Sequence, residues 1–237
     1  MVQLFHPQLS LNQYFNNSLL DWGALAPAER RMLSEHTETV DVKSRHVLFH
    51  EGTYPKGVYR IISGKVKLYK PLSDGSSQLV GLCISDEVFA YRAVISNQVH
   101  SVSAATLEPS VLEFIPSEVF MNVLHNSVEF SNFLLVKMSQ EFGMWINRAL
   151  LFAQMDIRRR LAITLLVLNE KFKTPKSITP TSAIHISRTD LAAFVGATLE
   201  TVIRMLKKFV DEDLIKVKGK NIIISDLKQM LKVADIG

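Results

Sequence analysis

Residues 186–204 read ISRTDLAAFVGATLETVIR, a pattern typical of two short helices joined by a tight turn. Ser187 is a good N-cap for the first helix, and Asp190 follows three residues later, near the positive helix end. Gly196 allows the left-handed conformation that ends many helices, and Thr198 can cap the second helix. The segment therefore predicts a helix-turn-helix.

The second of these helices has one apolar side and one charged side. Apolar residues recur at helical spacing and are expected to pack on the rest of the domain: Val202, Met205, Leu206 and Phe209. The outer side carries Glu200, Ile203, Arg204, Lys207 and Lys208. A helix with Glu and Arg near its N-terminus suits the major groove of DNA. The alternative is an ordinary helical hairpin whose charged residues face water.

A short hairpin is predicted directly after the helix-turn-helix. Residues 214–217 and 221–224 are rich in β-branched side chains, and Lys218-Gly219-Lys220 separates them. In this position the hairpin is a wing whose lysines can reach phosphate groups, or else a hairpin tip that only promotes solubility. The side chains that we expect to contact DNA are Arg188, Thr198, Leu199, Glu200, Ile203, Arg204, Lys207, Lys218 and Lys220.

Composition places the chain among ordinary globular proteins. Its 237 residues are 47% hydrophobic and 21% charged, which is enough for a sizeable core and two domains. The single cysteine, Cys83, excludes an intramolecular disulfide. No apolar stretch approaches a membrane span, and no secretory signal is visible, so we expect a cytoplasmic protein without a membrane partner. Residues 154–237 carry 15 Lys and Arg against 9 Asp and Glu, so the basic excess lies in the predicted DNA-binding part.

The middle of the chain is rich in short strand patterns separated by turn signals. They occupy residues 47–49, 57–62, 66–69, 78–84, 102–107 and 110–115. Many short strands at regular spacing predict a small antiparallel β-roll. The predicted fold class is therefore α+β, with a β-roll sensor domain (residues 1–126), a dimerisation helix (127–153) and a winged helix DNA-binding domain (154–237). Helical sequence starts at Pro116, with a break near Asn126, and the first helix of the last domain is expected at 154–172.

The predicted dimerisation helix has apolar residues in steps of four and three, as in a coiled coil. Its seam consists of Ser131, Leu135, Met138, Phe142, Trp145, Ala149 and Phe152. A second stripe, which could pack on the β-roll, consists of Phe130, Leu134, Ile146 and Leu150. A helix that is apolar on two sides needs two partners, and the second is expected to be the same helix of another subunit. The alternative is a helix buried inside one large domain.

The order of these parts resembles the Crp/Fnr superfamily of bacterial transcription regulators. The most specific part is Leu-Ala-x-x-x-Gly-x-Thr-x-Glu-Thr-Val-x-Arg, which begins at Leu191. The resemblance implies a homodimer on a palindromic operator in double-stranded DNA, with RNA polymerase as a further partner. It also implies that Arg204 binds a guanine and Glu200 a cytosine amino group. Leu199 stands where family members often have Arg, and Asp213 where they usually have Gly before the wing.

The sensor region departs from the cyclic-nucleotide binders of this family. They carry a Gly-Glu-Leu-Ala cassette and, downstream, an arginine that pairs with the cyclic phosphate. Here Tyr91 replaces the glutamate and His100 replaces the arginine, so the charged partners of the nucleotide are lost. We therefore predict no cofactor, do not expect cAMP to bind, and leave open an unknown small effector. The candidate effector residues are Ala90, Tyr91, Arg92, His100 and Ser101.

Other functions remain open at this point. The iron–sulfur chemistry of the oxygen-responsive branch lacks its N-terminal cysteines, whereas haem is left open because any of the seven histidines could be a ligand. A cupin-like metal enzyme has only the weak cluster His46, His50 and Glu51, so we predict neither a metal site nor an enzyme. A signalling regulator that uses the β-roll without binding DNA is the other alternative, and the basic C-terminal part argues against it.

Overall fold

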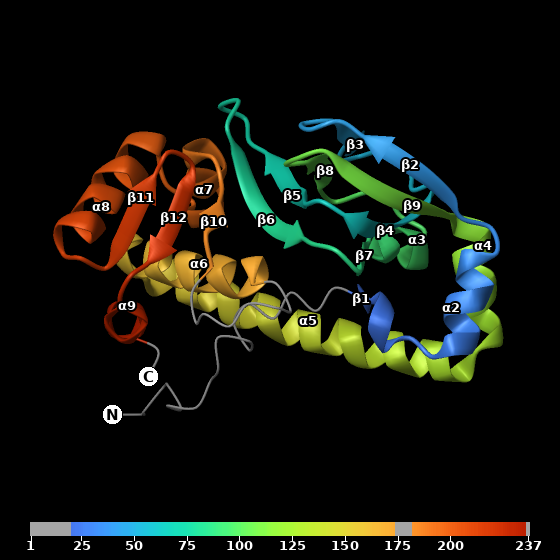
Figure 1. The fold of residues 1–237 in the computed structure, drawn as a ribbon. Helices are drawn as coiled ribbons and strands as arrows, with labels where there is room; N and C mark the ends of the chain where they lie inside the picture. The colour runs from blue at the N-terminus through green and yellow to red at the C-terminus, as the bar shows by residue number, and fades with distance from the viewer. Residues whose placement is uncertain (1–19, 174–181, 236–237) are drawn as a thin grey trace. The chain divides into compact units, whose positions relative to one another are not determined.

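The structure is a computed structural model that describes residues 20–173 and 182–235. These residues divide into two compact units, 20–142 and 143–235 (Figure 1). The boundary falls within a long helix. It differs from the predicted division at residues 126 and 153, because the first half of that helix packs with the β-roll.

Two antiparallel sheets form the β-roll of the first unit, which confirms the α+β prediction. The five-stranded sheet has the order β1-β7-β4-β9-β2 and the four-stranded sheet the order β3-β8-β5-β6. The strands are β1 (Leu20–Asp21), β2 (Glu38–Val42), β3 (Val47–Phe49), β4 (Gly57–Ser63), β5 (Val66–Pro71), β6 (Ser77–Cys83), β7 (Glu87–Phe89), β8 (Ser103–Thr106) and β9 (Ser110–Pro116). All the strands predicted individually are present, and Cys83 is buried at the end of β6.

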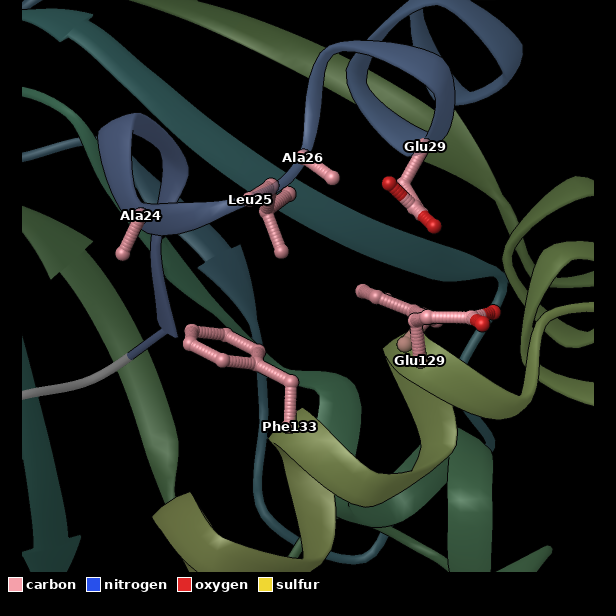
Figure 2. A pocket seen from close by; sticks show the side chains of 7 residues that line it. Ala24, Leu25, Ala26, Glu29, Glu129 and Phe133 are labelled. Atoms are coloured by element: carbon pink, nitrogen blue, oxygen red, sulfur yellow. The ribbon is translucent and has the colours of Figure 1, made fainter.

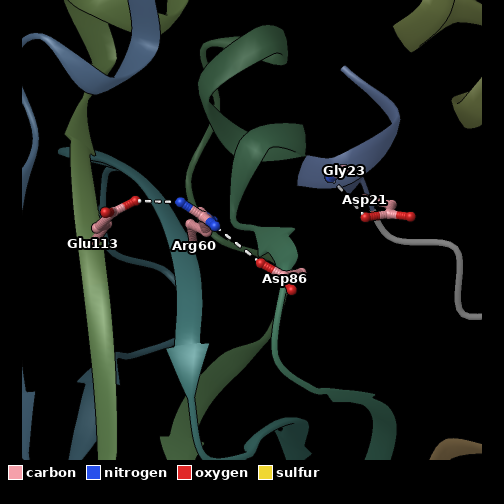
Figure 3. Close-up of polar contacts among 5 residues, drawn as sticks. All are labelled: Asp21, Gly23, Arg60, Asp86 and Glu113. Atoms are coloured by element: carbon pink, nitrogen blue, oxygen red, sulfur yellow. Dashed lines mark hydrogen bonds and ion pairs between the residues drawn. The ribbon is translucent and has the colours of Figure 1, made fainter. Parts of the chain in front are cut away.

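Arg60 on β4 ties the N-terminal segment to this sheet. Its guanidinium group contacts Glu113 at 3.0 Å and Asp86 at 2.9 Å, as Figure 3 shows. The same group lies 4.5 Å from the ring centroid of Trp22, a cation–π geometry. Trp22 begins the short helix η1 (Trp22–Ala24), which is capped by Asp21. These contacts hold the start of the described chain in place.

Helices α2 (Pro27–Ser34), α3 (Tyr91–Ser96) and α4 (Ser117–Asn126) complete the unit, and α5 (Val128–Gln154) follows after the predicted break. The hydroxyl of Ser127 accepts a hydrogen bond from the Phe130 backbone at 3.1 Å, so it caps α5. Phe130 and Leu134 are buried, as expected for the second stripe, but Ile146 is 45% exposed and does not continue it. The stripe ends early because that part of α5 belongs to the other unit. Leu150 has a side chain outside the described residues.

The second unit is a winged helix. Its elements are α6 (Ile157–Phe172), β10 (Ile184–His185), α7 (Arg188–Val195), α8 (Leu199–Asp211), β11 (Ile215–Lys218), β12 (Asn221–Ile224) and α9 (Leu227–Ala234), and its sheet has the order β10-β12-β11. Residues 161–169 of α6 are all buried, so this helix forms the centre of the core. It starts later than residue 154, because Asp156 caps it by accepting from the Arg159 backbone at 2.8 Å. Residues 174–181, which follow Lys173 after this helix, lie outside the described residues.

Candidate nucleic-acid interface and sensor site

Three local signals build the helix-turn-helix as predicted. The Ser187 hydroxyl accepts from the Asp190 backbone at 3.0 Å and caps α7. Gly196 ends α7 in the left-handed conformation, with φ of 68°. Thr198 then caps α8 by accepting from the Thr201 backbone at 3.3 Å. The turn between the two helices is thus fixed at both ends by side chains close in sequence.

Helix α8 separates its apolar and charged residues cleanly. Val202, Leu206 and Phe209 are buried against the unit, and Met205 is half-buried. The opposite side is open to solvent, and Ile203 is 50% exposed. The exposed residues near the start and along this side are Thr198, Leu199, Glu200, Ile203, Arg204, Lys207 and Lys208. The predicted DNA-contacting side of α8 is therefore free of packing contacts within the unit.

The wing is the antiparallel hairpin β11–β12, in which Lys218 pairs with Asn221. Gly219 in its turn has φ of 58°, and Lys218 and Lys220 are exposed on either side. Asp213, which precedes the wing, adopts φ of 57° as expected for an aspartate at that position. The wing lysines and α8 therefore both present cations to solvent on this unit.

Arg188 is placed differently from the other candidate DNA contacts. It is half-buried, and its guanidinium donates to the backbone oxygen of Gly219 at 2.8 Å. Burial lowers the pKa of Arg188. This side chain joins the first residue of α7 to the turn of the wing, so in the structure it positions the wing relative to the helix-turn-helix.

In the sensor region, the side chain of Tyr91 turns into the core. Ala90 has φ of 73° just before α3, and Tyr91 is only 1% exposed. Its hydroxyl donates to the buried carboxylate of Glu141 on α5. Burial raises the pKa of Glu141, whereas the hydrogen bond from Tyr91 and the charge of Arg92 lower it. Burial likewise raises the pKa of Tyr91, so its hydroxyl keeps its proton and remains a donor.

Glu141 was not among the predicted site residues. The sequence does contain a signal for it, because Glu141 follows Leu134 by seven residues and Phe130 by eleven on the same helix. That spacing puts a carboxylate on the apolar side that Phe130 and Leu134 bury. A charged residue at a buried position indicates a polar partner, and here the partner is Tyr91.

The imidazole of His100 is stacked in an aromatic cluster. It is 5% exposed, and its ring centroid lies 3.8 Å from that of Phe49, with the planes 14° apart. Burial lowers the pKa of His100, so the neutral ring is favoured at neutral pH. The adjacent Ser101 is exposed, and its backbone oxygen accepts from Lys70 at 3.4 Å. The position that the family fills with an arginine therefore holds a neutral, stacked ring.

The predicted dimer seam lies on an open side of α5. Leu135 and Phe142 are 65% and 69% exposed, Ala149 is exposed, and Met138 is half-buried. Trp145 is 37% exposed, with the guanidinium of Arg148 5.4 Å from its ring centroid. The side chain of Phe152 lies outside the described residues.

Within residues 20–173 and 182–235, no group of three or more His, Cys, Asp or Glu side chains could hold a metal ion. Glu51 of the suspected cluster pairs instead with Lys70, at 2.5 Å. Among the helices that the structure describes, none is long and apolar enough to cross a membrane.

Two family models match the chain, and together they cover more than half of it. A cyclic nucleotide-binding domain matches residues 39–127, and a Crp-like helix-turn-helix domain matches residues 159–233. The chain belongs to the Crp/Fnr superfamily. It is a DNA-binding transcription regulator of Crp/Fnr type, and the prediction that it is not an enzyme is confirmed by this membership.

The similar proteins include regulators with different names. The chain is 26% identical over 190 residues to a fumarate and nitrate reduction regulatory protein of Vibrio cholerae. The aligned residues cover 80% of this chain and 75% of that protein. It is 25% identical over 208 residues to a CRP-like cAMP-activated global transcriptional regulator of Mycobacterium tuberculosis, with coverages of 88% and 93%. The structure of FixK2 from Bradyrhizobium japonicum is similar in fold, with a TM-score of 0.73, 19% identity and coverages of 84% and 97%.

Proposed function

We propose that this Crp/Fnr regulator binds a palindromic operator as a homodimer, with one copy of α8 in each of two successive major grooves. The observation that carries the proposal is the open side of α8, where Glu200 and Arg204 lie near the N-terminus and face away from the core. Arg204 would donate two hydrogen bonds to a guanine, and Glu200 would accept from a cytosine amino group. Leu199 and Ile203, which are about half exposed, would contact thymine methyl groups.

Phosphate contacts would come from the exposed lysines of this unit. Lys207 is on α8, and Lys218 and Lys220 flank the wing turn. Such contacts position a protein on the duplex without reading its sequence. Arg188 would act indirectly, because it holds the wing through the oxygen of Gly219.

A homodimer would provide the two copies of α8 that a palindrome requires. The exposed seam of α5 supports this part of the proposal, because large apolar side chains such as Phe142 remain in water in the single chain. A second copy of α5 is the partner that would cover them. As in other activators or repressors of this type, RNA polymerase at the promoter is the further partner that we propose.

The test begins with selection of an operator from random duplex DNA by the full-length protein. We expect a palindrome with a guanine that depends on Arg204. Arg204→Ala should lower the preference for that guanine by about 1–3 kcal/mol, or roughly 5- to 150-fold. Arg31→Ala is the matched control, because Arg31 is an exposed arginine on α2. An unchanged base preference in Arg204→Ala would refute the assignment, and a selection that enriches no sequence would favour a regulator without direct DNA binding.

We further propose that the sensor site does not take cAMP, because its polar groups are committed elsewhere. Tyr91 is bonded to Glu141, and His100 is neutral and stacked on Phe49. Each missing charge-assisted hydrogen bond is worth roughly 1.5–3 kcal/mol. Calorimetric titration with cAMP and cGMP is therefore expected to give dissociation constants in the millimolar range or weaker. A low micromolar constant would contradict the proposal and indicate Arg92 as the replacement anchor.

A further inference from the structure

A cavity of about 180 Å³ lies between the segment that joins η1 to α2 and the first two turns of α5. Figure 2 shows Leu25 extending from this segment toward the ring of Phe133 on α5, and Glu29 extending from α2 toward Glu129. Glu129, Phe130 and two alanines complete the lining. The cavity exceeds the roughly 150 Å³ of an engineered protein cavity that binds benzene. It is therefore large enough for an organic molecule of that size.

Glu29 supplies a buried carboxylate whose bonding is incomplete. The residue is only 7% exposed, and its Oε1 accepts from the Ser127 hydroxyl at 2.9 Å. Its Oε2 is buried and has no hydrogen-bond partner in the part of the chain that the structure describes. A carboxylate oxygen removed from water without a partner is costly. The unused acceptor capacity of Glu29 Oε2 points to a hydrogen-bond donor that enters the cavity from outside.

A second carboxylate lies beside the first. Glu129 Oε2 is 3.5 Å from the same Ser127 hydroxyl that donates to Glu29. A serine hydroxyl has one proton to donate, so it can satisfy only one of the two acids at a time. The Ser127 oxygen also accepts from the Phe130 backbone at 3.1 Å. Both carboxylates thus approach the Ser127 hydroxyl, but only Glu29 is buried, because Glu129 is exposed to water.

The rest of the wall is apolar and partly aromatic. Leu25 and Phe130 are buried, and Phe133 is half-buried. The ring of Phe133 already attracts a cation, because the Lys137 ammonium group lies 5.6 Å from its centroid. A hydrated metal ion would find too few oxygen ligands in such a wall. The lining instead suits a charged head group attached to an apolar body.

We propose that this cavity binds a small organic ammonium ion, with its charge on the carboxylates of Glu29 and Glu129 and its apolar body against Leu25, Phe130 and Phe133. The volume corresponds to a body of about six to eight heavy atoms. The ammonium group would supply the hydrogen bonds that Glu29 Oε2 lacks, and its positive charge would balance the two acids. None of the lining residues is among the candidate DNA-contacting residues or the candidate effector residues around Tyr91.

Benzylamine is a suitable probe because it combines an ammonium group with a benzene-sized body. Calorimetric titration into the full-length protein near neutral pH is expected to show binding. Benzyl alcohol, which has the same shape without the charge, is expected to bind about tenfold more weakly or worse. Absence of benzylamine binding, or equal binding of the alcohol, would overturn the proposal.

The variant Glu29→Gln tests the role of the carboxylate. Glutamine keeps an oxygen that accepts from Ser127 but removes the charge, so benzylamine affinity should fall about tenfold or more. Glu35→Gln is the matched control, since Glu35 is exposed at the end of the same helix, and it should bind like the native chain. Unchanged affinity in Glu29→Gln would overturn the proposal. If circular dichroism shows that this variant does not fold, Glu129→Gln replaces it, and undiminished binding there would count equally against the site.

Discussion

Phe142 offers the sharpest test of the proposed dimer, because it lies in the middle of the α5 seam and is 69% exposed in the single chain. Complete burial of a phenylalanine side chain stabilises a structure by roughly 1.5–3 kcal/mol. The exposed share that remains to be buried is thus worth about 1–2 kcal/mol in each subunit. A two-fold dimer contains this residue twice, so Phe142→Ala removes about 2–4 kcal/mol of association free energy.

This loss corresponds to a dimer dissociation constant that is roughly 30- to 700-fold higher. Sedimentation equilibrium of the native chain and of Phe142→Ala over a range of concentrations measures the constant directly. Tyr54→Ala is the matched control, because Tyr54 is an aromatic residue of the β-roll unit that is 75% exposed but is not on α5. We expect this control to associate like the native chain. A native protein that sediments as a monomer at micromolar concentration, or a Phe142→Ala constant within twofold of native, would refute the reasoning.

Two further predictions concern charges. Lys218→Ala and Lys220→Ala should each reduce the slope of log affinity for DNA against log salt by about 1, measured by fluorescence anisotropy, and an unchanged slope would remove that lysine from the phosphate contacts. Burial raises the pKa of Glu141, so the folded state binds this proton more tightly than the unfolded chain does. The free energy of unfolding therefore falls as pH rises above the unfolded pKa of about 4.3, because Glu141 must then ionise in a buried position. Glu141→Gln keeps an acceptor for Tyr91 and should therefore be more stable than the native chain at neutral pH, with an advantage that shrinks below about pH 4. Denaturant unfolding of both proteins at several pH values measures this difference. A difference in stability that does not change with pH would contradict the prediction.

The helix-turn-helix could be predicted in detail because its signals are local. Ser187 and Thr198 cap their helices through backbone groups three residues away. Gly196 ends α7 because glycine readily adopts the left-handed backbone conformation found there. The short strand β7 is different, because it depends on pairing with β4 and β1, which are distant in sequence. A three-residue segment has too little pattern to reveal such partners. The start of α6 was missed for a smaller reason, since Asp156 rather than a residue before it provides the cap.

In the sensor region, the sequence predicts which residues are replaced but not which partners the new side chains contact. The replacement of a glutamate by Tyr91 is visible in the sequence, but the direction of the side chain is not. Its partner Glu141 is fifty residues further along, so only the fold brings the two together. His100 is a similar case, because Phe49, on which its ring stacks, is about fifty residues earlier in the sequence and only the fold brings the two rings together.

The Tyr91–Glu141 pair lies on the buried side of α5, next to a residue of the predicted dimer seam. Glu141 is 5% exposed and faces the core, whereas the next residue, Phe142, is 69% exposed on the side of the predicted seam. Consecutive residues of a helix point in directions about 100° apart, so one turn can serve two surfaces. A contact with the first residue of α3 and a predicted contact with a second subunit therefore involve the same turn of α5.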